Sequence, residues 1–196
     1  MCGRYYVDDS MVEEIEQIFN GIDNRLNGKA FRGDIYPTNT APVISAASSG
    51  LQLRETRWGY PGIDRKGVII NARTETVREK RLFRAGIERG RIVIPAVHFY
   101  EWNRQKTKYI FCREDKSPLY LAGIADLFER EQRFVILTTL ANPSMERVHD
   151  RMPLVLELDQ VRDWLLDSRA ADNILRQTPV LLDRYTEYEQ LTLFDL

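Results

Sequence analysis

Hydrophobic and polar residues alternate in short runs through the middle of the chain, a pattern typical of half-buried strands. Turn-forming residues separate these runs at close intervals. The strands predicted in this way cover residues 91–95, 99–103, 108–113, 119–124 and 134–139. Short strands at such spacing favour antiparallel neighbours. We therefore expect a curved sheet or barrel at the centre of the molecule.

Further β-type runs lie on both sides of this central group. They cover residues 5–7, 41–46, 51–58, 67–71 and 154–156. The first of them follows Cys2 closely, so a strand there would hold the N-terminal residues in place. Residues 20–34 are rich in asparagine and glycine, which predicts a surface loop.

A helix is predicted after the first strand, because apolar residues recur there with helical spacing. These residues are Val12, Ile15, Ile18 and Phe19. Ser10 and Glu13 form a Ser-x-x-Glu capping box, which predicts that Ser10 caps this helix.

Helical patterns recur in three later places. Residues 74–89 are helical in pattern and basic, although Gly86 weakens their continuity. A short helix is expected from Asn142 to near His149, and a final helical pair begins at residues 161–166 within a C-terminal extension, 157–196. The chain has no internal repeat and no linker. We therefore predict one α+β domain over residues 1–196, mainly an antiparallel curved sheet or barrel with peripheral helices.

Composition narrows the class of protein. The chain has 196 residues, 43% hydrophobic and 29% charged, which is ordinary for a soluble globular domain. It has no signal peptide pattern and no apolar run long enough to span a bilayer, so a cytoplasmic protein without membrane contact is expected. Two cysteines and two histidines without metal-ligand spacing predict neither a disulfide framework nor a metal, and no cofactor is expected.

The formal net charge of −1 gives no global attraction to nucleic acid, so DNA binding would need a local basic patch. One segment qualifies. Between Arg73 and Arg91 seven basic residues face three glutamates: Arg73, Arg78, Lys80, Arg81, Arg84, Arg89 and Arg91 against Glu75, Glu79 and Glu88. A solvated helix face is the alternative interpretation of such a run.

The most informative position is Cys2. Removal of Met1 would leave Cys2 with a free α-amine beside its thiol, a pair that no internal cysteine offers. Such a 1,2-aminothiol condenses with an aldehyde to an imine, and the sulfur then closes a thiazolidine ring. The alternative is that a cysteine follows the initiator methionine by chance.

Asn71 and Glu101 are candidates for polar groups in a pocket. Asn71 and Arg73 end a buried strand, a rigid platform from which polar groups can be aimed, although a turn with a helix cap also fits. Strand alternation places Glu101 on the face of Phe99, so a carboxyl enclosed by aromatic rings could act as a general acid. The alternative is an exposed glutamate with the aromatic rings turned inward.

Two later segments, 138–142 and 148–153, add further polar residues. His149 lies between a predicted helix and a strand, where an imidazole can project into a cleft, and Arg151 follows two positions on. His98 is the competing imidazole. It ranks lower because its position favours the strand face opposite Glu101.

Five motifs in order resemble the SOS response-associated peptidase (SRAP) family. They are Met1-Cys2-Gly3-Arg4; Trp58-Gly59; Asn71-Ala72-Arg73 with Glu75-Thr76; Pro95-Ala96 leading to Tyr100-Glu101-Trp102; and His149-Asp150-Arg151-Met152-Pro153. The resemblance covers residues 2–156. It implies a β-rich single domain that binds single-stranded DNA, shields abasic sites through a thiazolidine cross-link and removes its own Met1.

The resemblance also implies roles for individual residues. Cys2 is the cross-linking nucleophile, Asn71 orients the N-terminal residue, Glu101 is the acid/base and His149 assists proton transfer. Arg73 and Arg151 are expected to bind backbone phosphates, with Arg4 as a further candidate, and Pro37 and Trp58 to pack against bases. Tyr60-Pro61 directly after Trp58-Gly59, and Val97-His98 in place of Asp-Gly, depart from the family pattern.

We therefore expect an autopeptidase, which is a hydrolase. We also expect it to form DNA–protein cross-links at abasic sites, a lyase-like activity. Its partner would be single-stranded DNA with abasic sites, and it would act as a monomer in the response to DNA damage. Two alternatives stay open: a cysteine peptidase that cleaves other proteins, with Cys2 and His149 as its dyad, and a DNA-binding module in which Cys2 is idle.

Overall fold

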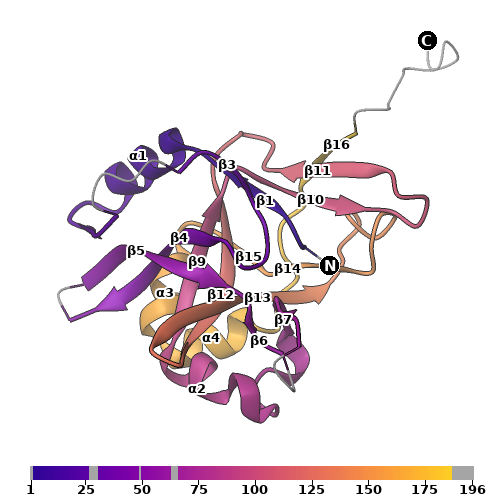
Figure 1. Cartoon of the computed structure of the whole chain (residues 1–196). Coiled ribbons are helices and arrows are strands. Elements are labelled where there is room, and N and C mark those ends of the chain that lie inside the picture. Colours follow the sequence, from indigo (N-terminus) through magenta and orange to yellow (C-terminus); the bar gives the residue numbers. More distant parts are fainter. Residues whose placement is uncertain (1, 27–30, 49, 63–65, 187–196) are drawn as a thin grey trace, which may run out of the picture.

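A closed barrel of five strands forms the centre of the protein. The computed structural model describes residues 2–26, 31–48, 50–62 and 66–186. The barrel strands are β4 (Thr40–Ala47), β5 (Gly50–Trp58), β9 (Arg91–Ala96), β12 (Leu119–Phe128) and β13 (Glu131–Leu140). Neighbours in the order β13-β12-β9-β4-β5 pair antiparallel, and a parallel pairing of β5 with β13 closes the ring (Figure 1). The predicted α+β fold with a β-barrel is confirmed.

A second, antiparallel sheet holds the start of the chain. Its strands, in spatial order, are β16 (Asp183–Thr186), β11 (Lys108–Cys112), β10 (His98–Trp102), β1 (Tyr5–Val7) and β3 (Gly33–Ile35). Tyr5 pairs with Phe99 of β10 on one side and with Ile35 of β3 on the other. The backbone N–H of Tyr100 donates to the carbonyl of Arg4 at 3.0 Å, which extends the ladder toward Cys2.

Two short strands flank the second half of β13. In β8 (Asn71–Arg73) Asn71 pairs with Ile136 and Arg73 with Thr138, in parallel. On the other side of β13 lies β14 (Arg151–Pro153), which runs antiparallel to it. Segments that are about 80 residues apart in the sequence therefore meet at one end of the barrel.

Smaller strands complete the sheets. Among them, β15 (Val155–Leu156) pairs with β12, β2 (Asp23–Asn24) with β5, and β6 (Tyr60–Pro61) with β7 (Val68–Ile69).

The helices lie at the periphery. In Figure 1, α2 (Arg81–Arg89), α3 (Gln160–Leu166) and α4 (Ser168–Ile174) lie together below the barrel, and α1 (Asp9–Ile18) lies apart from them at the upper left. The indole N–H of Trp164 in α3 donates to the carbonyl of Ile92 at 2.9 Å and fixes α3 on β9. Because β9 is covered in this way, all six of its residues are buried.

Aromatic rings join the two sheets. The indole of Trp58 is fully buried, lies parallel to the ring of Phe134 at 6.1 Å and contacts the ring of Tyr5 at 5.2 Å between centroids. Its N–H donates to the carbonyl of Ile70 at 3.0 Å, so its polar atom is satisfied inside the core. Tyr5 thus anchors β1 to the barrel.

Several boundaries differ from the predicted ones because tertiary pairing overrides local pattern. Residues 74–89 form a 3₁₀ turn at Thr74–Thr76 and, after a break, α2. Residues 142–149 form hydrogen-bonded turns instead of a helix. The predicted loop 20–34 contains β2 and part of β3, and the expected helical extension includes β16.

The cap of α1 also differs from the prediction. Asp8 is the N-cap residue, and its carboxylate accepts the backbone N–H of Met11 at 2.9 Å. The hydroxyl of Ser10 donates to the same carboxylate at 2.7 Å. The Ser-x-x-Glu motif therefore does not cap this helix, and an aspartate two positions earlier does.

We predict that Asp8→Ala lowers the free energy of unfolding by about 1 kcal/mol, the usual effect of losing an N-cap. Ser10→Ala should have a smaller effect, because the hydroxyl supports the cap without accepting a helical N–H. Urea denaturation followed by circular dichroism measures both. A larger loss for Ser10→Ala than for Asp8→Ala would contradict this assignment.

Candidate active site around Cys2

Cys2 lies in a closed environment at the end of the barrel. Its side chain is 0% exposed. The side-chain amide of Asn71 donates to the backbone carbonyl of Cys2 at 3.2 Å. Because Asn71 is part of β8, which is hydrogen-bonded to β13, this amide is a fixed donor that holds the main chain of Cys2 against the barrel.

Glu101 approaches the same residue from the second sheet. The ladder that pairs Tyr5 with Phe99 brings Glu101 alongside the residues before β1. Glu101 is 5% exposed, and its negative charge raises the pKa of the Cys2 thiol. The expected enclosed position of Glu101 on the face of Phe99 is confirmed, and the exposed alternative is excluded.

The thiol of Cys2 is held in its protonated form at neutral pH. Burial, and after it the negative charge of Glu101, raises the pKa of Cys2 to about 12. The backbone carbonyl of Arg4 lies 3.9 Å from the sulfur, within the range of a weak S–H hydrogen bond. A thiol in this state is a poor nucleophile until a base removes its proton.

His149 occupies the neighbouring cavity of about 530 Å³, which Trp102 and Asp150 also line. Its Nδ1 accepts the backbone N–H of Arg151 at 2.9 Å. That donor always carries its proton, so the neutral imidazole carries its own proton on Nε2. The carboxylate of Asp150 is also 2.8 Å from Nδ1, but its side chain is 86% exposed, so we assign the tautomer from the backbone bond.

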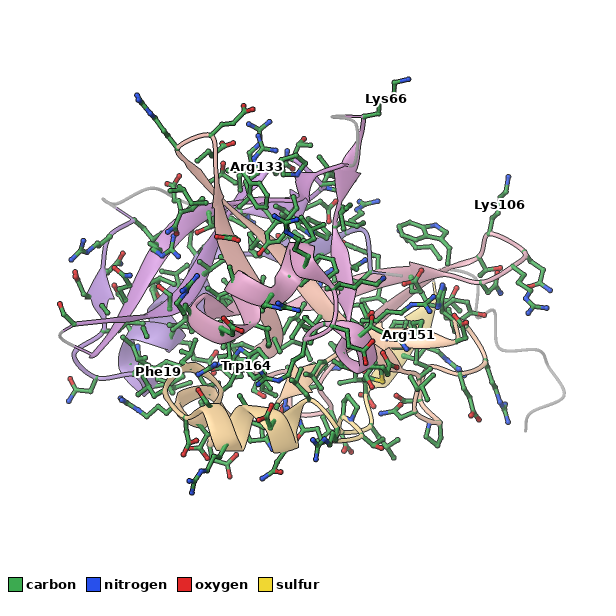
Figure 2. All side chains as sticks on the ribbon, turned by 90° about the horizontal axis from the view of Figure 1, so that it is seen from below. Phe19, Lys66, Lys106, Arg133, Arg151 and Trp164 are labelled. Carbon is green, nitrogen blue, oxygen red and sulfur yellow. The ribbon has the colours of Figure 1, made fainter. Side chains whose placement is uncertain are left out.

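Arg151 is a buried structural residue in this structure. Its guanidinium forms a two-point ion pair with Glu75 and donates to the backbone carbonyl of Thr138. The pair with Arg151 holds the pKa of Glu75 below its usual range. In Figure 2 the labelled side chain of Arg151 lies within the body of the molecule, whereas that of Lys106 projects from the hairpin between β10 and β11. Both Nη atoms of Arg151 are thus engaged within the protein in this structure, and its expected phosphate contact stays a prediction.

Arg73 is exposed and stands two positions after Asn71, the residue that binds Cys2. With Asn71 and Thr138 it lines a cavity of about 570 Å³ that also contains Lys80, Arg81 and Phe83. The sequence shows Lys80 and Arg81 as members of the basic run, but it does not assign them to the site. Their position in the same cavity as Asn71 depends on the fold, which the local pattern does not predict.

Arg4 lies on the other side of Cys2, within an aromatic cluster. Its guanidinium pairs with Asp34 and lies over the rings of Tyr36 and Tyr100, at 5.1 and 4.5 Å from their centroids. Tyr36 is 45% exposed, and Pro37 next to it is half-buried. These two residues present an apolar surface beside a cation, which suits a nucleobase and its phosphate.

Trp58 is enclosed in the core of this structure. Its indole lies between Tyr5 and Phe134 and is 0% exposed, so neither of its faces is open to a base. The motif Trp58-Gly59 identified an important position, but its role in this structure is to support β1.

Comparisons with known proteins identify the family of the chain. The sequence model of the family "SOS response associated peptidase (SRAP)" matches residues 1–194. The chain is 36% identical over 186 residues to the abasic site processing protein YoqW of Bacillus subtilis, covering 84% of this chain and 80% of that protein. It is 29% identical over 176 residues to the abasic site processing protein YedK of Escherichia coli, covering 84% and 79%.

The fold has a close relative among solved structures. A crystal structure of a protein from Bordetella bronchiseptica superimposes with a TM-score of 0.79 at 23% identity, covering 94% of this chain and 99% of that one. The family match spans nearly the whole chain, so the protein belongs to the SOS response associated peptidase family. No helix in the described part of the chain is long and apolar enough to cross a membrane.

We predict that alkylation of Cys2 in DNA-free protein is slow at pH 8 and rises without a plateau up to pH 10, because its pKa is about 12. Glu101→Gln should speed the reaction several-fold at each pH, since removing a negative charge lowers that pKa and each unit is tenfold in thiolate. Peptide mass spectrometry after timed exposure to iodoacetamide measures both, with Cys112 in the same sample as the internal reference. A plateau below pH 9 would contradict the burial argument.

Proposed function

We propose that this protein captures abasic sites in single-stranded DNA by a covalent thiazolidine on Cys2, after removal of Met1. The observation that carries the proposal is the convergence of Asn71 and Glu101 on Cys2 in a closed site. Family membership and the names of the relatives support the same substrate, a DNA strand with a missing base. The cross-link would shield the lesion from cleavage.

The high pKa of the thiol sets the order of the chemical steps. A buried thiol with a pKa of about 12 does not attack first at neutral pH. The α-amine of processed Cys2 does, because an unperturbed α-amine titrates near 7.7–8.0. Imine formation therefore precedes the attack of sulfur.

Glu101 is placed to move the protons of both steps. As a carboxylate it takes the proton of the C1′ hydroxyl and gives it to the ring oxygen of the abasic deoxyribose, which opens to the aldehyde and leaves Glu101 ionised again; the Cys2 amine then adds to C1′ with loss of one water. The resulting carboxylate then accepts the thiol proton as sulfur bonds to C1′, and that proton ends on the ring nitrogen. The sum is aldehyde plus amine plus thiol to thiazolidine plus water, so atoms and charge balance without a cofactor.

His149 assists from the adjoining cavity. Because its Nδ1 accepts from the Arg151 backbone, its proton lies on Nε2, from which it passes to a sugar or phosphate oxygen. The ion pair of Arg151 with Glu75 fixes this backbone. Arg151 therefore acts as a positioning residue for His149, and Arg73, Lys80 and Arg81 contact the phosphates.

Self-removal of Met1 uses the same groups. The Cys2 sulfur attacks the Met1 carbonyl and the peptide nitrogen leaves as the amine, which gives a thioester that water hydrolyses to free methionine and the aminothiol. The proton lost from sulfur goes to that nitrogen, and Glu101 carries it. Mass spectrometry of intact protein over time follows the loss of one methionine, and Cys2→Ala should prevent it.

A cysteine peptidase acting on other proteins is the weaker alternative. Such an enzyme needs a thiolate next to a histidine and a cleft open to a polypeptide. Cys2 is instead fully buried, so a polypeptide from another protein has no open access to its sulfur, whereas the Met1 peptide bond is joined to Cys2 itself.

We predict that processed protein forms a heat-stable band with a single-stranded oligonucleotide that carries an abasic site, on a denaturing gel. An added N-terminal extension that keeps the Cys2 amine in a peptide bond should abolish the band. Cys2→Ser should lose the heat-stable product yet retain an imine that borohydride traps, because only the amine is needed for it. Glu101→Gln should slow the reaction by about 10²-fold or more, the usual contribution of a general acid.

Cys112→Ser is the matched control, since Cys112 lies in β11 and takes no part in the proposed chemistry. It should cross-link as the parent protein does. Equal yields of heat-stable product with a blocked and a free amine would overturn the aminothiol mechanism.

We predict that Arg73→Ala weakens binding to undamaged single-stranded DNA equally for different sequences and lowers the salt slope by about 0.7, the value of one phosphate contact on a single strand. Thermal stability should change little, because Arg73 is exposed. Arg151→Ala should instead lower the melting temperature strongly, since it leaves Glu75 and Thr138 without their buried partner. Salt titrations by fluorescence anisotropy and thermal unfolding separate the two roles, and Arg25→Ala, paired with Asp23 at β2, is the control.

A further inference from the structure

A third cavity opens at the end of the barrel opposite Cys2. Its volume is about 490 Å³, and every barrel strand contributes to it: Ser45 of β4, Gln52 of β5, Ile92 of β9, Ala125 of β12 and Gln132 of β13. β13 leads from Gln132 at this cavity to Thr138 beside Asn71 and Arg73. At about 3.3 Å per residue, that separates the two sites by about 20 Å. We call it the barrel-mouth cavity.

Arg54 in this cavity is a cation without a countercharge. Its Nε donates to the hydroxyl of Ser45 and its Nη1 to that of Thr56, both at 3.0 Å. These partners are neutral, and in the described parts of the chain no ion pair involves Arg54. Burial alone lowers the pKa of this guanidinium, with no carboxylate to offset it. A half-buried, uncompensated charge is unfavourable for folding alone, which favours a role in binding an anion.

The rest of the lining increases the positive charge. Arg89 and Arg91, from the end of α2 and the start of β9, also line the cavity, against the single carboxylate of Glu88 among the lining residues. Arg91 is held by the carbonyls of Trp164 and Ile87. Gly90 allows the end of α2 to approach β12 closely, because a Cβ at this position would lie only 2.0 Å from the backbone oxygen of Ala125. The arginines are therefore mounted on a rigid junction of α2 and β12.

We propose that the barrel-mouth cavity binds a phosphate group. The planar guanidinium of Arg54, oriented by two hydroxyls, presents its remaining N–H groups as the two-point donor that a phosphate accepts. Arg89 supplies a second charge, and the amides of Gln52 and Gln132 offer neutral donors from neighbouring strands. A net positive lining suits a dianion. The phosphate belongs either to a free phosphorylated small molecule or to the backbone of a DNA strand that reaches this end of the barrel.

The test is a titration of the full chain with inorganic phosphate at constant ionic strength, with chloride as the replaced anion, followed by nuclear magnetic resonance. Phosphate should shift the backbone amides of Gly90 and Gln132 with saturation, and leave that of Asn71 unchanged. Arg54→Gln should raise the Kd for phosphate by about tenfold or more, as loss of a charged two-point contact does. Arg89→Gln, an exposed helical position that folding does not need, should raise it several-fold.

Arg57→Gln is the matched control, because Arg57 lies on the same strand but is bonded to Glu131 and to the carbonyl of Thr38. Its phosphate affinity should equal that of the parent. Displacement of phosphate by an undamaged single-stranded oligonucleotide would identify a DNA phosphate as the natural group, and its failure a free phosphorylated molecule. Unsaturable shifts, or equal affinities in Arg54→Gln, Arg89→Gln and the parent, would overturn the proposal.

Discussion

Everything proposed for Cys2 depends on the ladder between β1 and β10, which orders a part of the chain that is usually frayed. Terminal residues are mobile unless a sheet or helix ties them down. Here the backbone bond from Tyr100 to Arg4, the pairing of Tyr5 with Phe99 and the contact of Tyr5 with Trp58 fix the strand that follows Cys2. Asn71 then binds the Cys2 carbonyl itself. An aminothiol can act as a positioned nucleophile only on such a support.

The second constraint is the pairing of a thiol with a carboxylate in a dry site. Both groups are nearly excluded from water, and Glu101 adds to the effect of burial on the pKa of Cys2. This arrangement keeps sulfur protonated, which protects it from oxidation and alkylation while no substrate is present. In the proposed mechanism it also separates the roles of the two nucleophiles, because a free α-amine on Cys2 would react at a pH at which the sulfur does not. The carboxylate that suppresses the thiolate is the same group that can accept the thiol proton once an imine carbon lies beside it.

How much of this could be read from the sequence differs from element to element. The central strands and the buried side of Glu101 followed from period-two alternation, because each strand has one face toward the core. The parallel closure of β5 on β13 and the pairing of β8 with β13 were not visible, since such contacts join distant segments and leave no local pattern. The cap at Asp8 was missed because Ser10 matches the capping motif equally well. The roles of Asn71 and His149 came from the family resemblance, because local chemistry alone left more than one role open for each.

For Trp58 and Arg151, the role expected from the motif differs from the contacts that the side chain makes in the structure. Both stand at positions that the family pattern assigns to DNA contacts, yet in this structure one is enclosed by aromatic rings and the other by Glu75 and Thr138. We therefore expect the DNA surface at two other groups: Arg73, Lys80 and Arg81 along the cavity next to Asn71, and the half-buried Arg4 with the exposed Tyr36 on the second sheet. Both groups are connected to Cys2, because Asn71 binds its carbonyl and Arg4 follows it by two positions. Phosphate contacts at these groups would hold a strand near Cys2 without reading bases, which suits a nearly neutral protein that must find a lesion in any sequence.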